Sequence, residues 1–263
     1  MTPRRAPAAP AMPGVSGTLS NSARGAEHLF FPANGAWQDE PDAPPVLALD
    51  TSSKIGGAAL LRGIELLGEE TWAVGGSHTQ QVLPAAARLC QRAGVRIPEL
   101  GLVVVATGPG SFTGLRVGAS LGKGLVAALG IPLIGVPTLD AVAYQWQAVS
   151  GRILALVDAG RGHVYAGMYR NTARGLSRAG EFKVLSDDEL SGFTDSRGSA
   201  VYVAGELTPG RALVLQGLPG VRVASPSAAP RRPANLGVLG YLRWRAGGAQ
   251  DASALQPMYL KRV

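Results

Sequence analysis

The sequence predicts an α/β protein with two lobes, each built around a mixed β-sheet. From residue 46 onward, segments with strand character alternate with segments of helical spacing. Each half of this part opens in the same order, with a strand, an aspartate, a turn and a second strand. The 263 residues, with a hydrophobic content of 46%, are sufficient for one large domain or two small lobes. We therefore expect one lobe over residues 46–150 and a second over residues 151–263.

The first 45 residues are rich in Pro, Ala, Ser and Gly and show no hydrophobic periodicity. This composition predicts a disordered extension over residues 1–45 that is dispensable for folding. Arg4 and Arg5 resemble the basic N-terminal region of a signal peptide, but no apolar segment follows them, so a signal peptide is not predicted.

Composition also limits the class of protein. The single cysteine, Cys90, excludes a disulfide framework and fits a protein of the reducing cytoplasm. The nearest approach to a membrane span, residues 124–136, is interrupted by Pro132, so no membrane anchor is expected. The formal net charge of +7 favours an anionic partner such as nucleic acid, although the arginines are spread along the chain.

The first lobe opens with a strand at residues 46–50, which ends in Asp50 and is followed by three hydroxyl residues, Thr51 to Ser53. Strands at residues 56–61 and 66–74 extend it into an antiparallel meander. An aspartate followed by hydroxyl side chains at the end of a strand can hold a metal-bound phosphate, or it can simply cap the turn. Taken alone, these residues favour the turn.

A helix over residues 79–93 is predicted next, because apolar residues recur there at helical spacing and Gly94 ends the pattern. His78 lies just before this helix and has no second histidine four residues later. A surface or capping role is therefore favoured over a metal ligand.

The centre of the lobe is a strand, turn and helix unit. A strand at residues 102–105 leads into the turn Gly-Pro-Gly at residues 108–110, and a helix over residues 112–129 follows, with Ser111 or Thr113 as its cap. The start of this helix is a potential anion site, but no lysine follows the turn as in a phosphate-binding loop. The residues therefore favour a structural role for the turn.

Glycine recurs every fourth residue in this helix, at Gly114, Gly118 and Gly122, on one face. Each glycine weakens a helix by about 1 kcal/mol relative to alanine, so something must approach this face closely. We expect the glycine face to be a groove for a partner protein. The alternative is that it packs against the sheet of the same chain.

The remaining elements are assigned in order. A strand at residues 132–136 and a helix over residues 138–149 complete the first lobe, and strands at residues 153–157 and 163–169 flank a turn that contains Asp158. After these come a helix start at residues 187–190, strands at residues 201–204 and 221–223, a helix at residues 235–245 and an extended tail at residues 256–262.

Six segments now carry a resemblance to a known family. In chain order they are LALDTSS, SHTQQVLPAAARL, ATGPGSFTGLRVGASLGKGL, IPLIGVPTLDAVA, LVDAGRGHVYAGMY and PMYLKR. They resemble the bacterial tRNA threonylcarbamoyladenosine biosynthesis protein TsaB, or YeaZ, family. The resemblance implies a two-lobed actin/hexokinase-like (ASKHA) fold. It also implies a non-catalytic partner of the subunit TsaD, which acts with the ATPase TsaE on the adenosine beside the tRNA anticodon.

The resemblance implies specific roles for residues of this chain. We expect a heterodimer with TsaD, a homodimer in its absence, contact with TsaE and tRNA only through the complex, and ATP and metal on the partner subunits. A degenerate nucleotide site is expected at Asp50, Thr51, Ser52 and Asp158, and a partner interface at His78, Gln81, Val82, Gly114, Arg116, Gly118 and Gly122.

The sequence also departs from the related proteins. TsaD-like proteins carry a His-x-x-x-His metal pair where this chain has Thr138 and Val142, and neither residue replaces an imidazole ligand. Gly160 and His163 stand where TsaB proteins usually have Arg and Glu. Two alternatives remain, an ASKHA-type ATPase or phosphotransferase that uses Asp50 and a metallopeptidase-like protein. The lack of an adenosine-binding loop opposes the first, and the lack of the histidine pair opposes the second.

Overall fold

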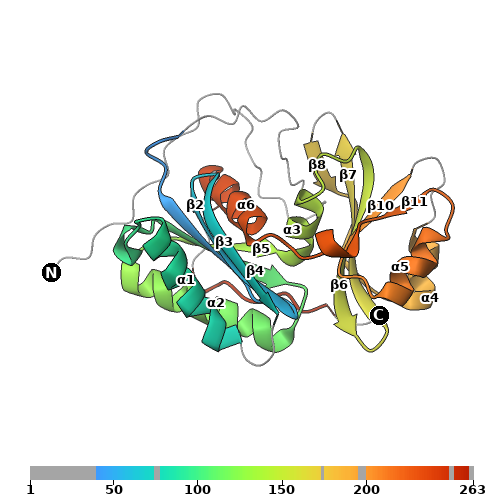
Figure 1. Cartoon of the computed structure of the whole chain (residues 1–263), viewed down its shortest axis with the longest axis horizontal. Coiled ribbons are helices and arrows are strands. Elements are labelled where there is room, and N and C mark those ends of the chain that lie inside the picture. The colour runs from blue at the N-terminus through green and yellow to red at the C-terminus, as the bar shows by residue number, and fades with distance from the viewer. Residues whose placement is uncertain (1–39, 74–77, 173–174, 195–199, 249–251, 261–263) are drawn as a thin grey trace.

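The computed structural model of the chain describes residues 40–73, 78–172, 175–194, 200–248 and 252–260. Two β-sheets lie side by side, and helices cover both faces of each (Figure 1). This confirms the predicted α/β class and the two mixed sheets. None of the helices in the described ranges is long and apolar enough to cross a membrane.

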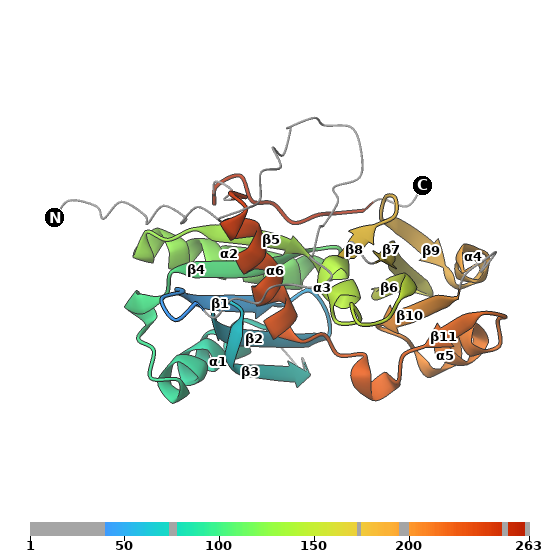
Figure 2. The same ribbon diagram turned by 90° about the horizontal axis from the view of Figure 1, so that it is seen from above.

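The first sheet has the strand order β3-β2-β1-β4-β5. Its strands are β1 (Pro45–Asp50), β2 (Ile55–Arg62), β3 (Glu65–Ala73), β4 (Leu102–Gly108) and β5 (Leu133–Pro137). Strands β1, β2 and β3 form the predicted antiparallel meander, and β4 and β5 run parallel to β1. Helices α1 (His78–Arg92) and α2 (Phe112–Leu129) cover one face, and α6 (Pro233–Arg245) crosses the other (Figure 2).

The second sheet has the order β11-β10-β6-β7-β8, and β9 also pairs with β7. Its strands are β6 (Gly151–Gly160), β7 (His163–Thr172), β8 (Gly175–Arg178), β9 (Lys183–Ser186), β10 (Val201–Gly205) and β11 (Val221–Val223). Helices α4 (Asp187–Phe193) and α5 (Pro209–Gln216) lie on its outer side, and α3 (Thr138–Tyr144) packs against β6 between the two sheets.

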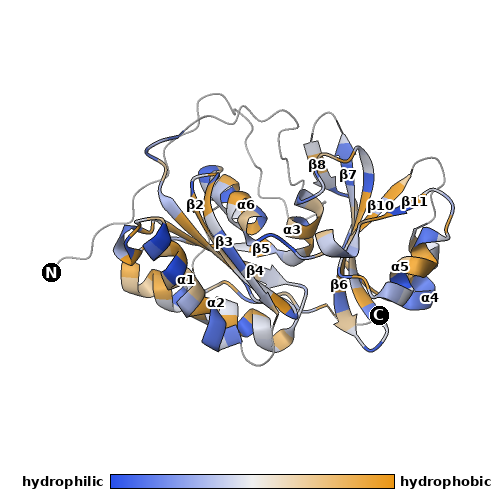
Figure 3. Cartoon of the chain, viewed as in Figure 1, coloured by the Kyte–Doolittle hydropathy of each residue, from blue (hydrophilic) through white to orange (hydrophobic). Residues whose placement is uncertain are grey.

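The central strands are buried on both faces, which explains their continuous apolar sequences. In β1, Leu47 and Leu49 pack against α1 and α2, whereas Val46 and Ala48 pack against α6 on the opposite face. The same alternation in β6 divides its residues between the core of the second lobe and the core that joins the lobes. The two helices under the first sheet carry both hydrophilic and hydrophobic residues (Figure 3), as expected of helices with one face on a sheet and one in solvent.

The predicted boundary between the lobes is wrong at the C-terminal end. Helix α6 packs on β1, β2, β4 and β5 of the first sheet, and the following tail also returns to that lobe, where Met258 N donates to Thr107 O at 2.7 Å. The approach is close: a Cβ at Gly240 would lie 2.3 Å from a methyl group of Val104. Residues 151–263 therefore do not form a separate lobe, because α6 supplies the second covering layer that the first sheet needs.

The N-terminal boundary also differs from the prediction. Glu40 accepts hydrogen bonds from Tyr241 and Arg245 of α6, and Ala43 is buried. The last residues of the predicted extension, 40–45, thus belong to the first lobe. The rest of that extension, residues 1–39, lies outside the described residues.

Candidate functional site

The candidate site lies between the lobes, at the carboxyl end of β1. Asp50 ends this strand and is buried, and its Oδ1 accepts hydrogen bonds from Ser52 N at 2.9 Å and from Ser52 Oγ at 2.5 Å. In α/β proteins, ligands bind at such carboxyl ends of strands. The degenerate nucleotide site expected here stays a prediction, and the structure shows which side chains occupy its position.

A buried arginine, Arg231, fills this position. Its Nε donates to Asp50 Oδ2 at 2.9 Å, and its Nη1 donates to Glu206 Oε1 at 2.6 Å. Its Nη2 donates to the hydroxyl oxygens of Ser52 and Ser53, at 3.0 and 2.9 Å. Asp50 belongs to the first sheet and Glu206 follows β10 of the second, so one guanidinium connects the two lobes.

The electrostatics keep this network charged. Burial alone would raise the pKa of Asp50, but the guanidinium of Arg231 and the hydrogen bonds from Ser52 outweigh it and lower the pKa. Burial opposes the charge on Arg231, yet Asp50 and Glu206 together raise the pKa of its guanidinium. Both groups are therefore ionised in the folded protein.

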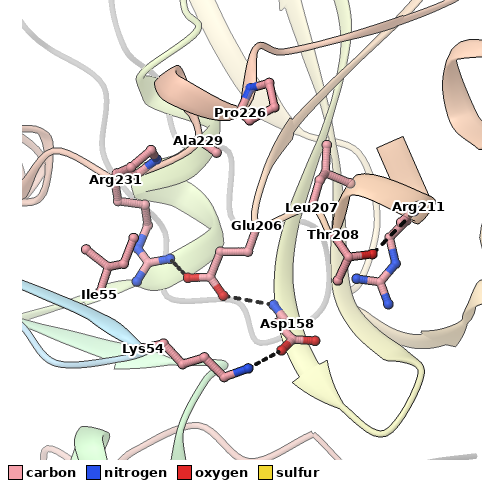
Figure 4. Close-up of a pocket in the computed structure, with 11 residues that line it drawn as sticks. Lys54, Ile55, Asp158, Glu206, Leu207, Thr208, Arg211, Pro226, Ala229 and Arg231 are labelled. Atoms are coloured by element: carbon pink, nitrogen blue, oxygen red, sulfur yellow. Dashed lines mark hydrogen bonds and ion pairs between the residues drawn. The ribbon is translucent and has the colours of Figure 1, made fainter. Parts of the chain in front are cut away.

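Asp158 continues the network in the second lobe (Figure 4). Its backbone N donates to Glu206 Oε2 at 3.0 Å, and its Oδ2 lies 3.4 Å from Lys54 Nζ, whose side chain is 90% exposed. Gly205 has a φ of +107°, and a Cβ there would lie 2.1 Å from Leu156 O, so glycine is required to bring Glu206 to this point.

A cavity of about 280 Å³ opens beside these ion pairs. Its walls combine charged residues with apolar ones, among them Ile55, Leu207 and Pro230. The charged residues of its lining are the carboxylates of Asp158 and Glu206 and the cations of Lys54, Arg211 and Arg231.

The structure therefore brings together three of the four predicted remnant residues: Asp50, Ser52 and Asp158. Thr51 lies apart, because its hydroxyl donates to Gly114 O at 2.7 Å and fixes α2 on the sheet. Sequence reasoning missed Arg231 and Glu206. Glu206 follows a predicted buried strand and a glycine, a position that could have been noticed, but Arg231 lies in a loop without any periodic signal.

The glycine face of α2 is not a partner groove. A Cβ at Gly114 would lie 2.0 Å from Thr51 O, one at Gly118 would lie 2.5 Å from Thr51 Oγ1, and one at Gly122 would lie 2.7 Å from Val105 Cγ1. The three glycines are buried and let α2 approach β1 and β4 of its own sheet, so their assignment to the partner interface is wrong.

Two further residues of the predicted interface are also buried. Val82 packs in the core, and His78 is held under the sheet, with its Nε2 at 3.0 Å from Ser53 O. Its Nδ1 is buried and has no hydrogen-bond partner among the residues that the structure describes, and burial lowers the pKa of the ring. The surface or capping role expected for His78 is therefore wrong, and only Gln81 and Arg116 of the predicted interface are exposed.

The exposed side of α1 and α2 has a different character. On α1, Leu83 is exposed. Among the exposed residues of α2, Ser120, Gly124 and Ala127 are small, whereas Phe112 and Arg116 near its start are large. A Cβ at Gly124 would meet nothing within 4 Å. The two helices contact each other, so their exposed sides belong to neighbouring elements of the first lobe.

The segment in which the resemblance implied the loss of a histidine pair is a packing element in the structure. Thr138 and Val142 are buried on α3, and Asp140 between them accepts hydrogen bonds from Tyr169 Oη at 2.7 Å and Arg243 Nη2 at 2.8 Å. Burial raises the pKa of Asp140, although Arg243 partly offsets this. Asp140 thus joins a strand of the second sheet to α6.

The fold and this site define a two-lobed α/β protein with a mixed sheet in each lobe, whose inter-lobe position is filled by its own arginine. A protein-family profile described as TsaD, tRNA N6-adenosine threonylcarbamoyltransferase, matches residues 73–209. YeaZ from Pseudomonas aeruginosa is 27% identical with a TM-score of 0.68, covering 82% of this chain and 100% of that one. The chain belongs to the TsaB/YeaZ family, which is assigned to tRNA threonylcarbamoyladenosine biosynthesis.

Individual sequences support the same assignment. An uncharacterized protein of Mycobacterium tuberculosis is 32% identical over 82% of this chain and 92% of its own length. The tRNA threonylcarbamoyladenosine biosynthesis protein TsaB of Bacillus subtilis is 37% identical over 48% of this chain and 55% of its own length. The resemblance found in the sequence is therefore confirmed.

Proposed function

We propose that the chain is a non-catalytic subunit of a complex that forms threonylcarbamoyladenosine in tRNA. In this proposal it binds a TsaD-type catalytic subunit directly and meets a TsaE-type ATPase through the complex. The observation that carries the proposal is Arg231, whose guanidinium lies at the end of β1, where an ASKHA enzyme needs room for a metal-bound phosphate.

The geometry supports the lack of catalysis. Both carboxylate oxygens of Asp50 are engaged, Oδ1 by Ser52 and Oδ2 by Arg231, so neither is free to hold a cation. Ser52 and Ser53 are bound to the same guanidinium. The chain thus uses as internal structure the groups that would serve an ATPase, and in our proposal ATP and metal belong to the partner subunits.

The partner surface in this proposal is the exposed side of α1 and α2, centred on Leu83 and Gly124. The small residues of α2 leave space for a helix of the partner, and Leu83 offers an apolar side chain for burial. The TsaD family profile matches the part of this chain that contains α1 and α2. We therefore propose that a TsaD-type subunit presents a pair of helices similar to α1 and α2. The same surface would pair two copies by two-fold symmetry when TsaD is absent.

Calorimetric titration of the chain with the TsaD-type subunit of the same organism tests the interface. Leu83→Glu and Gly124→Leu should each weaken binding at least tenfold, because one places a charge in the contact and the other fills the open space at Gly124. Leu213→Glu is the matched control, since Leu213 is an exposed leucine on α5 of the other lobe. Unchanged affinity of both interface variants would refute the surface, and ATP turnover by the isolated chain would refute the non-catalytic role.

A further inference from the structure

Two aromatic rings and a guanidinium form an exposed cluster at the start of α2. Phe112 and Tyr259 are 52% and 48% exposed, and their ring centroids lie 5.1 Å apart. The guanidinium carbon of Arg116 lies 3.8 Å from the centroid of Phe112, and its Nε donates to Tyr259 Oη at 3.3 Å. We call Phe112, Arg116 and Tyr259 the aromatic platform.

Two segments that are far apart in the sequence hold the platform in place. Ser111 N donates to Ser52 O at 2.7 Å, and the hydroxyl of Ser111 caps α2, which fixes the position of Phe112. Tyr259 follows Met258, whose N donates to Thr107 O at 2.7 Å. The rings are therefore positioned before any ligand arrives, which lowers the entropic cost of binding one.

The charges around the platform favour an anionic ligand. Arg116 is exposed and has no ion-pair partner among the described residues, so its charge remains available. The chain as a whole has a net charge of +7.

We propose that the aromatic platform binds an unpaired base of single-stranded RNA, with Arg116 on the neighbouring phosphate. Aromatic side chains and arginine at this spacing are the groups with which proteins stack exposed bases, and cationic residues beside them track the backbone. The proposal rests on the proposed function, from which the RNA would be a loop of the substrate tRNA, contacted by this chain directly.

Fluorescence anisotropy with a labelled tRNA anticodon stem–loop tests the proposal on the full chain. Tyr259→Ala and Phe112→Ala should each weaken binding about tenfold, the loss typical of one stacked base, and Tyr259→Phe should retain affinity. Arg116→Gln should also reduce the slope of log affinity against log salt by about one. Leu213→Ala is the control, and a fully paired RNA duplex should bind more weakly than the stem–loop.

The outcomes separate this inference from the proposed function. Equal RNA affinity of the wild type, Phe112→Ala and Tyr259→Ala would overturn the platform, as would a preference for the duplex. If Tyr259→Ala instead loses the TsaD-type subunit in calorimetry while RNA binding is unchanged, the platform is a protein contact and the inference is wrong. Failure of the wild type to bind the TsaD-type subunit would refute the proposed function. The RNA titration would still test the aromatic platform, because it uses this chain without that subunit.

Discussion

Replacement of Arg231 by methionine removes the guanidinium that joins the two lobes. It leaves the buried carboxylate of Asp50 without its cation and breaks the hydrogen bonds to Ser52, Ser53 and Glu206. Breaking a buried ion pair by removing one partner costs about 3–5 kcal/mol. For a chain of this size, each 1 kcal/mol lowers the unfolding temperature by about 2–4 °C, so we expect a loss of roughly 6–20 °C.

The dependence of this loss on pH follows from Asp50. In the wild type the pKa of Asp50 is lowered from its ordinary value of 3.8, so its contribution to stability is full above that pH and is lost as the pH falls through the folded-state pKa. Without Arg231, burial raises the pKa of Asp50, and the carboxyl group is then destabilising when it is ionised. The stability difference between the wild type and Arg231→Met should therefore shrink as the pH is lowered.

Differential scanning calorimetry of four proteins measures the effect. Arg232→Met is the matched control, because Arg232 is adjacent in sequence but pairs with Glu69 through a side chain that is 53% exposed, and such pairs contribute at most about 1 kcal/mol. The double variant Asp50→Asn/Arg231→Met should be more stable than Arg231→Met, because the unpaired charge is gone. If Arg231→Met unfolds at the same temperature as the control, the inter-lobe account is wrong.

Three further predictions concern helix packing, the buried histidine and the N-terminal boundary. Gly114→Ala should destabilise the protein strongly, because the new Cβ would lie 2.0 Å from a backbone oxygen. Gly124→Ala, with open space around it, should raise stability by up to about 1 kcal/mol. Equal unfolding temperatures of the two variants would contradict this difference. Burial lowers the pKa of His78 below 6.5. The contribution of His78 to stability is therefore full above pH 6.5 and is lost as the pH falls through its folded-state pKa. Parallel curves of unfolding free energy against pH for the wild type and His78→Gln would exclude this dependence. A chain that starts at residue 40 should unfold at a higher temperature than one that starts at residue 46, because the shorter chain lacks the Glu40 contacts with α6, and the same unfolding temperature for both would show that these contacts contribute nothing.

The elements that the sequence predicted well are those whose signal is local. The apolar runs of β1 and β4 and the capped helix α2, with Ser111 as its cap, follow from hydrophobic pattern and capping chemistry. Short elements without such patterns, among them β8, β9 and α5, were not predicted. Helix α3 ends at Tyr144, earlier than the predicted residue 149.

The errors at the candidate site have a physical cause. Periodicity placed Gly114, Gly118 and Gly122 on one face of a helix, but it contains no information about which neighbour that face meets. Arg231 and Asp50 are separated by 181 positions and meet only because α6 returns to the first sheet, so their pairing depends on the tertiary fold. The sequence therefore located the acidic end of the site and missed the cation that fills it.

The proposed role of this chain in the modification of tRNA can be measured directly. Nucleoside mass spectrometry of tRNA, after incubation with the TsaD-type and TsaE-type subunits, ATP and the threonylcarbamoyl donor, measures that role. We predict that threonylcarbamoyladenosine forms only when this chain is added to those subunits, and that the chain alone forms none. Formation of the modified nucleoside by this chain alone, or equal formation without it, would contradict the account.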